Sequence, residues 1–265
     1  MCLAERYNHM SEDTSPKPLF DLDAVFEVDE YMYFYGDFLT DERADAEVAA
    51  WTRLLELDSP MKILDVPCGF GRHANRLAAL GHAVTGVDFM PGFLEIARKR
   101  AQERGVQVDY RQGDMRQINF VEEFERAVML FTSFGYFEDD GNVQVMENVA
   151  RALKPGGLLG FDIPNRDVIV KDLPACEVVD KDGNLMINRL SFDVLTGRFH
   201  NRRITVRDGV RKDKPFSIRL YNTTEIRDLL NRIGLEVYKM CGDDGQPLSA
   251  HSRGMMVVAR KPLRA

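Results

Sequence analysis

Two glycines and two carboxylates are spaced along the chain in a way that suits a nucleotide-containing ligand. Gly69 and Gly71 lie in the segment Asp65-Val66-Pro67-Cys68-Gly69-Phe70-Gly71, directly after a predicted strand. Glycine has no Cβ and accepts unusual dihedral angles, so a ligand can approach such a loop closely. Together with Ala74, these glycines match the dinucleotide fingerprint G-x-G-x-x-G/A. Asp88 ends the next predicted strand, where a carboxylate can accept hydrogen bonds from both ribose hydroxyls.

Three further features favour S-adenosylmethionine over a dinucleotide. Asp65 carries a negative charge, which is unfavourable beside a pyrophosphate but favourable beside the α-ammonium group of a methionine moiety. Asp114, in Gly113-Asp114-Met115, follows the third predicted strand, where an adenine amino group can donate to it. Leu153-Lys154-Pro155-Gly156-Gly157 makes a tight turn before the fifth predicted strand. A nicotinamide- or flavin-dependent enzyme remains the alternative at this point.

In these motifs, over roughly Met61 to Pro164 and again in its last two predicted strands, the chain resembles the class I S-adenosylmethionine-dependent methyltransferases. The resemblance implies that Asp65, Gly69 and Gly71 hold the methionine end of the cofactor and that Asp88 binds its ribose. It also implies that Phe89 or Met90 contacts the adenine face, and that Asp114 and the Met115 backbone bind the adenine edge.

The rest of the glycine loop is also expected at the cofactor or its product S-adenosylhomocysteine. Pro67 stands where the family has glycine or another small residue, and Cys68 follows it. Arg72 is placed to reach a carboxylate, which guanidinium groups bind through paired hydrogen bonds. Phe131, at the end of the fourth predicted strand, is also expected to contact the cofactor.

Methyl transfer from a sulfonium is an in-line displacement, so holding nucleophile, methyl group and sulfur in line supplies much of the rate. Acceptors usually bind after the fourth strand, which is followed here by Phe131-Thr132-Ser133-Phe134-Gly135-Tyr136-Phe137. These rings either line an acceptor pocket or pack against the adjoining helix, and Tyr136 is a candidate catalytic residue. His251, in the loop between the last two strands, is either a general base or a surface histidine. An amine acceptor needs only its neutral form, whereas an alcohol benefits from a base.

The densest aromatic cluster is Tyr31-Met32-Tyr33-Phe34-Tyr35, near the N-terminus. Aromatic rings attract a sulfonium through cation–π interactions, and similar methyltransferases use an N-terminal segment as a lid. We therefore predict that Tyr33 and Tyr35 contact the cofactor; ordinary core packing is the alternative.

The elements that must position these residues alternate between short β-rich runs and segments of helical period, which is typical of βαβ units. Helices are expected around Ala74–Ala78, Phe93–Ala101 and Val143–Leu153, and Gly81 and Gly105 are expected to end the first two. The strands are predicted at Lys62–Val66, Ala83–Val87, Val106–Tyr110, Ala127–Phe131, Leu158–Ile163, Leu235–Met240 and Met255–Ala259. The resemblance implies an α/β fold with a doubly wound, Rossmann-like, seven-stranded sheet of order 3-2-1-4-5-7-6.

A different pattern interrupts this domain after Pro164. Asp182-Gly183-Asn184, Thr196-Gly197 and Asp208-Gly209 separate β-rich runs, so Val178 to Tyr221 is predicted to form an inserted antiparallel flap. The expected division is 1–60 for an N-terminal lid and leading helix, 61–164 with 222–265 for the cofactor domain, and 165–221 for the flap. The flap is rich in basic residues: Arg198, Arg202, Arg203, Arg207, Arg211, Lys212 and Lys214. Three interpretations are open: these residues recognise an acidic group on the acceptor, they bind RNA, or they form a solvated face of the sheet.

Composition limits the remaining functions. The formal charge of −7, from 35 basic and 42 acidic side chains, argues against nucleic-acid binding as the main activity. The four cysteines form no C-x-x-C pair, so we expect neither a metal site nor disulfides, and we expect a cytoplasmic protein. No run approaches the roughly eighteen apolar residues of a membrane span. Met1 to Pro18 is interpreted as a short disordered leader without a secretory signal.

These observations together predict methyl transfer to an amino or hydroxyl group of a small molecule. RNA or protein methylation is the alternative, and a nicotinamide-dependent oxidoreductase is a more distant one. The sequence gives no sign of the oligomeric state.

Overall fold

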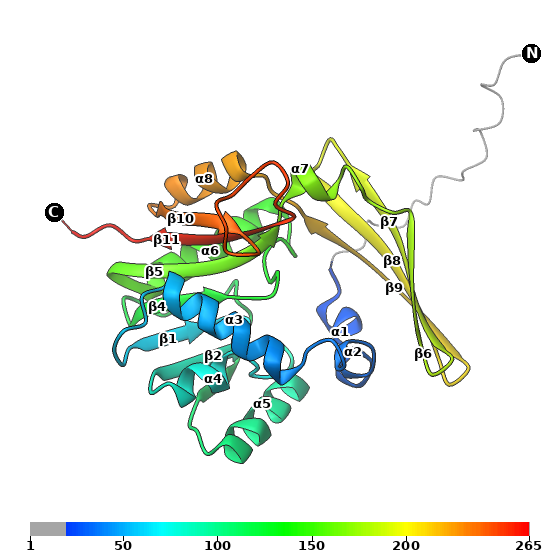
Figure 1. The fold of residues 1–265 in the computed structure, drawn as a ribbon, viewed down its shortest axis with the longest axis horizontal. Coiled ribbons are helices and arrows are strands. Elements are labelled where there is room, and N and C mark those ends of the chain that lie inside the picture. Colours follow the sequence, from blue (N-terminus) through cyan, green and yellow to red (C-terminus); the bar gives the residue numbers. More distant parts are fainter. Residues whose placement is uncertain (1–19, 265) are drawn as a thin grey trace, which may run out of the picture.

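The computed structural model describes residues 20–264, and the predicted leader lies outside them. Its centre is a seven-stranded sheet of order β10-β11-β5-β4-β1-β2-β3, in which β11 alone runs antiparallel to its neighbours (Figure 1). This order confirms the predicted 3-2-1-4-5-7-6 arrangement. The strands are β1 (Lys62–Asp65), β2 (Ala83–Asp88), β3 (Asp109–Gln112), β4 (Phe124–Met129), β5 (Leu153–Pro164), β10 (Glu236–Gly242) and β11 (Gly254–Arg260).

Several predicted strand bounds were wrong. β4 begins at Phe124 rather than Ala127, and β5 begins at Leu153 rather than Leu158, so residues 153–157, predicted as a tight turn, belong to β5. β3 begins at Asp109 rather than Val106, because the Val106 amide donates to Ala101 O at 3.0 Å and closes the end of the preceding helix. β4 ends at Met129 rather than Phe131. Phe131 and Thr132 have φ of 67° and 58°, left-handed values that cannot continue a strand.

Helices cover both faces of the sheet. On one face, Trp51, Leu77 and Leu94 pack against the strands. On the other face, Met146 and Leu230 do so. The helices of the first face are α3 (Asp41–Leu54), α4 (Ala74–Ala79) and α5 (Pro91–Arg104), and those of the second are α6 (Asp139–Ala152) and α8 (Thr223–Arg232). A capping box at Asn222 starts α8, and Gly105, at φ 69°, ends α5 as predicted.

The predicted flap is a separate four-stranded antiparallel sheet of order β6-β7-β8-β9, which extends to one side of the central domain (Figure 1). Its hairpins turn at the predicted glycines, Gly183, Gly197 and Gly209, all of which have positive φ. Helix α7 (Arg166–Ile169) precedes β6 (Cys176–Lys181), β7 (Asn184–Asp193), β8 (Arg198–Arg207) and β9 (Val210–Arg219).

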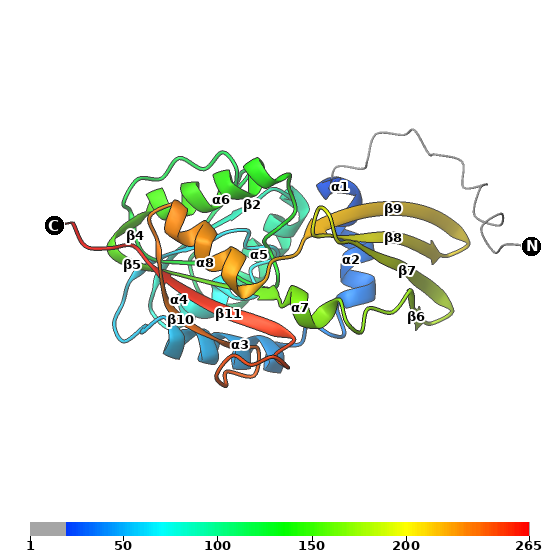
Figure 2. The ribbon, with the colours of Figure 1, turned by 90° about the horizontal axis from the view of Figure 1, so that it is seen from above.

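Two N-terminal helices, α1 (Leu22–Val25) and α2 (Val28–Tyr35), lie between the central domain and the flap (Figures 1 and 2). Buried Lys214 of β9 forms ion pairs with Glu27, at 2.8 Å, and with buried Glu30. Tyr33 Oη donates to Lys181 O at 2.9 Å. The N-terminal segment is therefore held to the flap by specific polar contacts. Among the described helices, none has the length and apolar character needed to span a membrane.

Candidate active site

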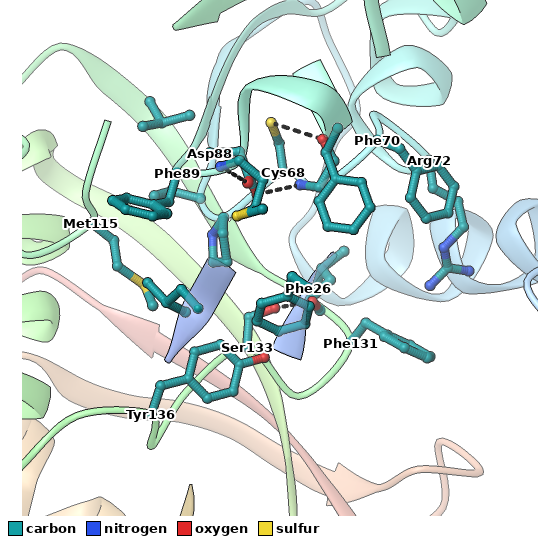
Figure 3. Close-up of a pocket in the computed structure, with 18 of the residues that line it drawn as sticks. Phe26, Cys68, Phe70, Arg72, Asp88, Phe89, Met115, Phe131, Ser133 and Tyr136 are labelled. Carbon is teal, nitrogen blue, oxygen red and sulfur yellow. Dashed lines mark hydrogen bonds between the residues drawn. The ribbon is translucent and has the colours of Figure 1, made fainter. Parts of the chain in front are cut away.

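A cavity opens at the carboxyl ends of β1, β2 and β4, beneath α1 and α2 (Figure 3). Phe89 and Met115 lie on one side of it in this view, and Arg72 and Phe131 on the other. The sequence-predicted residues that line it are Pro67, Cys68, Gly69, Arg72, Asp88, Phe89, Met90, Asp114, Met115, Phe131 and Tyr136. Residues far apart in the sequence thus meet at one edge of the sheet, where ligands bind in open α/β folds.

The two loop glycines have different surroundings. Gly69 has φ 52°, and a Cβ added there would have no other atom within 4 Å. Gly71 has φ 76°, and a Cβ there would lie 2.2 Å from Tyr110 Oη. Gly69 therefore borders open space where a ligand fits, whereas Gly71 permits close packing beneath the loop.

Asp88 ties this loop to the end of β2. Its Oδ2 accepts from the Gly69 amide at 2.7 Å, and its Oδ1 accepts from the Met90 amide at 2.8 Å. Burial raises the pKa of Asp88 to about 6, although these backbone hydrogen bonds oppose the rise. At neutral pH the carboxylate is ionised, and it can accept further hydrogen bonds from ligand hydroxyls.

Asp65, predicted at the cofactor, is buried and does not line the cavity, whereas Arg72 does; the two hold polar atoms of opposite character. Asp65 Oδ2 and Arg72 Nη2 have no hydrogen-bond partner among the described residues. Arg72 Nη1 is bound to Glu47 at 2.5 Å. Burial, and next the charge of Asp88, raise the pKa of Asp65 to about 8. Leaving buried polar atoms unpaired is costly, so a ligand with an ammonium and a carboxylate group complements this pair.

Asp114, the residue predicted to bind the adenine edge, also binds Arg116. Asp114 lines the cavity beside Gly113 and Met115, and it accepts from the Arg116 amide at 2.8 Å and from the Arg116 guanidinium. Burial opposes ionisation of Asp114, but the hydrogen bonds from Arg116 outweigh it and lower its pKa. Asp114 is therefore an ionised acceptor at the edge of the cavity.

Aromatic rings close the remaining side. Phe26 and Tyr31 come from the N-terminal segment, and Phe131, Tyr136 and Phe137 follow β4. Tyr136 Oη donates to Thr132 O at 3.1 Å, and burial raises the pKa of this phenol, so it is neutral at physiological pH. Leu22, Phe26 and Ser133 also line the cavity, and the sequence reading missed them.

The structure separates the tyrosines of α2. Tyr31 lines the cavity, and Tyr35 stacks on it with ring centroids 4.8 Å apart. Tyr33, predicted at the cofactor, instead faces the flap, where it also accepts from Asn184 Nδ2 at 2.8 Å. The spacing of the tyrosines could have predicted this separation, because residues 31 and 35 lie on the same face of a helix and residue 33 does not.

His251 lies apart from the other predicted site residues. It is exposed in the loop between β10 and β11, and its amide donates to Ser249 Oγ at 3.2 Å. The cavity lining contains a different histidine, His73, whose Nε2 lies 2.8 Å from Glu47 Oε2. Within residues 20–264, no group of three or more His, Cys, Asp or Glu side chains is arranged to hold a metal ion.

Comparison with known proteins places this geometry among methyltransferases. A family model described as a methyltransferase domain matches residues 63–157. The relative YqeM of Bacillus subtilis (strain 168), a methyltransferase by name, is 28% identical over 231 residues, which are 80% of this chain and 89% of the relative.

A second relative is the dTDP-4-amino-2,3,4,6-tetradeoxy-D-glucose N,N-dimethyltransferase of Saccharopolyspora spinosa. It is 33% identical over 182 residues, covering 67% of this chain and 68% of the relative. Among solved structures, an S-adenosylmethionine-dependent methyltransferase from Clostridium acetobutylicum ATCC 824 has a TM-score of 0.74 at 18% identity. The match covers 88% of this chain and 98% of that one, and at this identity it shows the shared fold.

Proposed function

The chain belongs to the class I S-adenosylmethionine-dependent methyltransferases, and on that premise we propose that it methylates an amino or hydroxyl group of a small molecule. The main support is the cavity itself, which joins a polar end, lined by Arg72 and Asp88, to an end lined by aromatic rings. Buried Asp65, which does not line the cavity, adds an unpaired carboxylate oxygen. The relative from Saccharopolyspora spinosa, named for methylation of an amino sugar, supports an amine acceptor.

The polar end fits the cofactor. We propose that the unpaired Asp65 Oδ2 binds the ammonium group of the methionine moiety and that the unpaired Arg72 Nη2 binds its carboxylate. Asp88 would bind the ribose hydroxyls, and Asp114 with the Met115 backbone would bind the adenine edge. When bound, S-adenosylmethionine supplies a methyl group on a positively charged sulfur.

The aromatic end suits positioning rather than proton transfer. Phe26, Tyr31 and Tyr136 enclose this part of the cavity, and such walls exclude water and restrict the orientation of an acceptor. The Tyr136 hydroxyl already donates a hydrogen bond to Thr132 O, so we assign it an orienting role. A neutral amine carries its own nucleophilic lone pair, and no base is required before transfer.

The basic flap gives little support to RNA as an acceptor. Lys212 and Lys214 pair with Glu27 and Glu30 of the N-terminal segment. Arg202 pairs with Asp213 at 2.6 Å, and Arg198 donates to Phe137 O at 2.8 Å. Because these charges are already paired within the chain, their concentration on the flap no longer indicates a polyanionic partner.

Residues 165–221 would then serve as a flap that holds the N-terminal lid in place, and residues 61–164 with 222–265 as the cofactor domain. We also propose a cytoplasmic location, since Cys68, Cys176 and Cys241 are free thiols.

Calorimetry with three ligands tests the cofactor assignment: S-adenosylhomocysteine, 5′-methylthioadenosine, which lacks the amino-acid group, and NADH. We expect S-adenosylhomocysteine to bind and NADH not to bind. Arg72→Met should weaken S-adenosylhomocysteine binding but leave 5′-methylthioadenosine binding unchanged. Binding of NADH in place of S-adenosylhomocysteine would refute the assignment, and equal weakening of both adenosine ligands would remove Arg72 from the carboxylate.

The acceptor class is tested by incubating the protein with S-adenosylmethionine and a panel of small amines, amino sugars and phenols. Formation of S-adenosylhomocysteine is the readout. Turnover that requires RNA or protein, and falls steeply with salt, would replace the small-molecule proposal.

A further inference from the structure

The turn that follows β4 contains an unusual backbone conformation. Phe131 and Thr132 are consecutive non-glycine residues with φ of 67° and 58°. The left-handed region is unfavourable for an L-residue with a Cβ, and a β-branched residue such as threonine is especially uncommon there. Something outside the turn must therefore hold these two residues in place.

The side chain of Asp162 does so from β5. Its Oδ1 accepts from the Phe131 amide at 2.7 Å, and its Oδ2 accepts from the Thr132 amide at 2.9 Å. Met129 pairs with Phe161 in the sheet, so Asp162 is the next residue along β5 where β4 leaves the ladder. A carboxylate thus replaces the backbone partner that the two amides lose at this point.

This turn directs the Phe131 ring towards the polar end of the cavity. The ring lies 4.9 Å from the Arg72 guanidinium carbon and 5.5 Å from that of Arg43. Both arginines are bound to Glu47, at 2.5 Å and 2.8 Å. Phe131 lines both the main cavity and a neighbouring one that Asp162 faces, so it forms part of the wall between them.

The same turn fixes Tyr136. The carbonyl group of Thr132 accepts from Tyr136 Oη at 3.1 Å, and the Tyr136 ring stacks on Phe20 with centroids 4.5 Å apart. A chain of contacts therefore runs from Asp162 through Thr132 to a ring of the cavity wall (Figure 3 shows Phe131 and Tyr136).

We infer that Asp162 is a positioning residue, which sets the orientation of Phe131 and Tyr136 by holding the turn between β4 and the acceptor end of the cavity. Its importance for methyl transfer rests on the proposed function, but its effect on the two rings does not. Asparagine at position 162 keeps the shape of the side chain but offers one oxygen, so one of the two amides would lose its acceptor.

The test is a double-variant cycle of Asp162→Asn and Thr132→Gly, because glycine adopts positive φ without needing the hydrogen bonds from Thr132 to Asp162 to hold it there. The protein is labelled with 3-fluorotyrosine, and the Tyr136 resonance is assigned by its loss in Tyr136→Phe. Hydrogen exchange of the Phe131 and Thr132 amides and calorimetry with S-adenosylhomocysteine complete the measurement. Asp213→Asn, on the flap, controls for loss of one carboxylate.

We expect Asp162→Asn to displace or broaden the Tyr136 resonance and to raise exchange of at least one of the two amides about tenfold, which is a change of about 1.4 kcal/mol. Adding Thr132→Gly should return the Tyr136 resonance at least halfway to its original position. Since the charge stays absent in the double variant, such recovery separates positioning from a direct effect of charge on the ring.

An unchanged Tyr136 resonance in Asp162→Asn would overturn the inference, and so would a resonance that Thr132→Gly fails to restore. If Asp162→Asn alone does not fold, the double variant carries the test: it must fold and show the Tyr136 resonance near its original position, and failure to do so also overturns the inference. Failure of the unmodified protein to bind S-adenosylhomocysteine would refute the proposed function and leave the role of Asp162 to be judged by the resonance.

Discussion

Replacing Lys214 with methionine should loosen the N-terminal lid from the flap. The side chain of Lys214 is 5% exposed and pairs with Glu30, whose side chain is 9% exposed. Thr205 Oγ1 also donates to Glu30 Oε1, at 2.8 Å. Without the lysine, the Glu30 carboxylate would keep one neutral donor in a site with little solvent.

The expected magnitude follows from this burial. Removing one partner of a buried ion pair lowers the free energy of unfolding by about 3–5 kcal/mol, because the other charge is left uncompensated. Movement of α2 can relieve part of that cost, so we expect about 3 kcal/mol for Lys214→Met. Lys212 is the matched control: its partner Glu27 is 42% exposed, and exposed pairs contribute about 0–1 kcal/mol.

Urea denaturation and thermal melting of both variants measure the difference. For a domain of this size, about 3 kcal/mol corresponds to a fall of about 6–12 °C in Tm. S-adenosylhomocysteine affinity should fall as well, since Phe26 and Tyr31 of the lid line the cavity. The double variant Lys214→Met/Glu30→Met should recover most of the stability. Equal, small effects of Lys212→Met and Lys214→Met, or no recovery in the double variant, would refute this account of the lid.

Three further predictions concern the cofactor. Gly69→Ala should weaken S-adenosylhomocysteine binding more than it weakens folding, whereas Gly71→Ala should mainly destabilise the fold, because its Cβ would lie 2.2 Å from Tyr110 Oη. Calorimetry measures the first effect and urea denaturation the second, and the reverse ranking of the two variants would contradict the loop geometry. Asp88→Ala should weaken S-adenosylhomocysteine and 5′-methylthioadenosine equally, by roughly 1–3 kcal/mol, since both carry the ribose, and unchanged affinity would remove Asp88 from the site. Burial raises the pKa of Asp65 to about 8, so this group is mostly protonated at pH 7, and a bound ammonium group, which favours the ionised form, should release a proton. Calorimetry at pH 7 in buffers of different ionisation enthalpy should detect that release, and Asp65→Asn should abolish it; the same release in that variant would point to another group.

The sequence alone predicted most of the features that depend on neighbouring residues. The strand, the glycine loop and the start of α4 follow one another within a short segment, so the loop was predicted from spacing; Gly69 lines the cavity, whereas Gly71 packs against Tyr110. Asp88 and Asp114 were identified in the same way, because each stands at or just after a predicted strand end. The turn residues likewise predicted the flap hairpins at Gly183, Gly197 and Gly209.

Contacts between distant elements were decided only by the tertiary structure. The basic residues of the flap gave no sign that Lys212 and Lys214 pair with Glu27, more than 180 positions earlier in the chain. Asp162 looked like one more residue of a strand, yet it binds the amides of Phe131 and Thr132. The strand β4 also ended earlier than its β-rich composition predicted, because that carboxylate stabilises a turn of two left-handed residues.

The tyrosines of α2 show the physical reason most directly. The resemblance to methyltransferases with an N-terminal lid predicted that this aromatic cluster meets the cofactor, but Tyr31 lines the cavity while Tyr33 binds the flap. Dihedral preferences and periodicity act between residues close in sequence, so a single chain reveals strands, turns and strand-end motifs. Which face of an element meets which partner depends on how several elements pack at once, and that was settled only when the lid, the flap and the sheet were assembled.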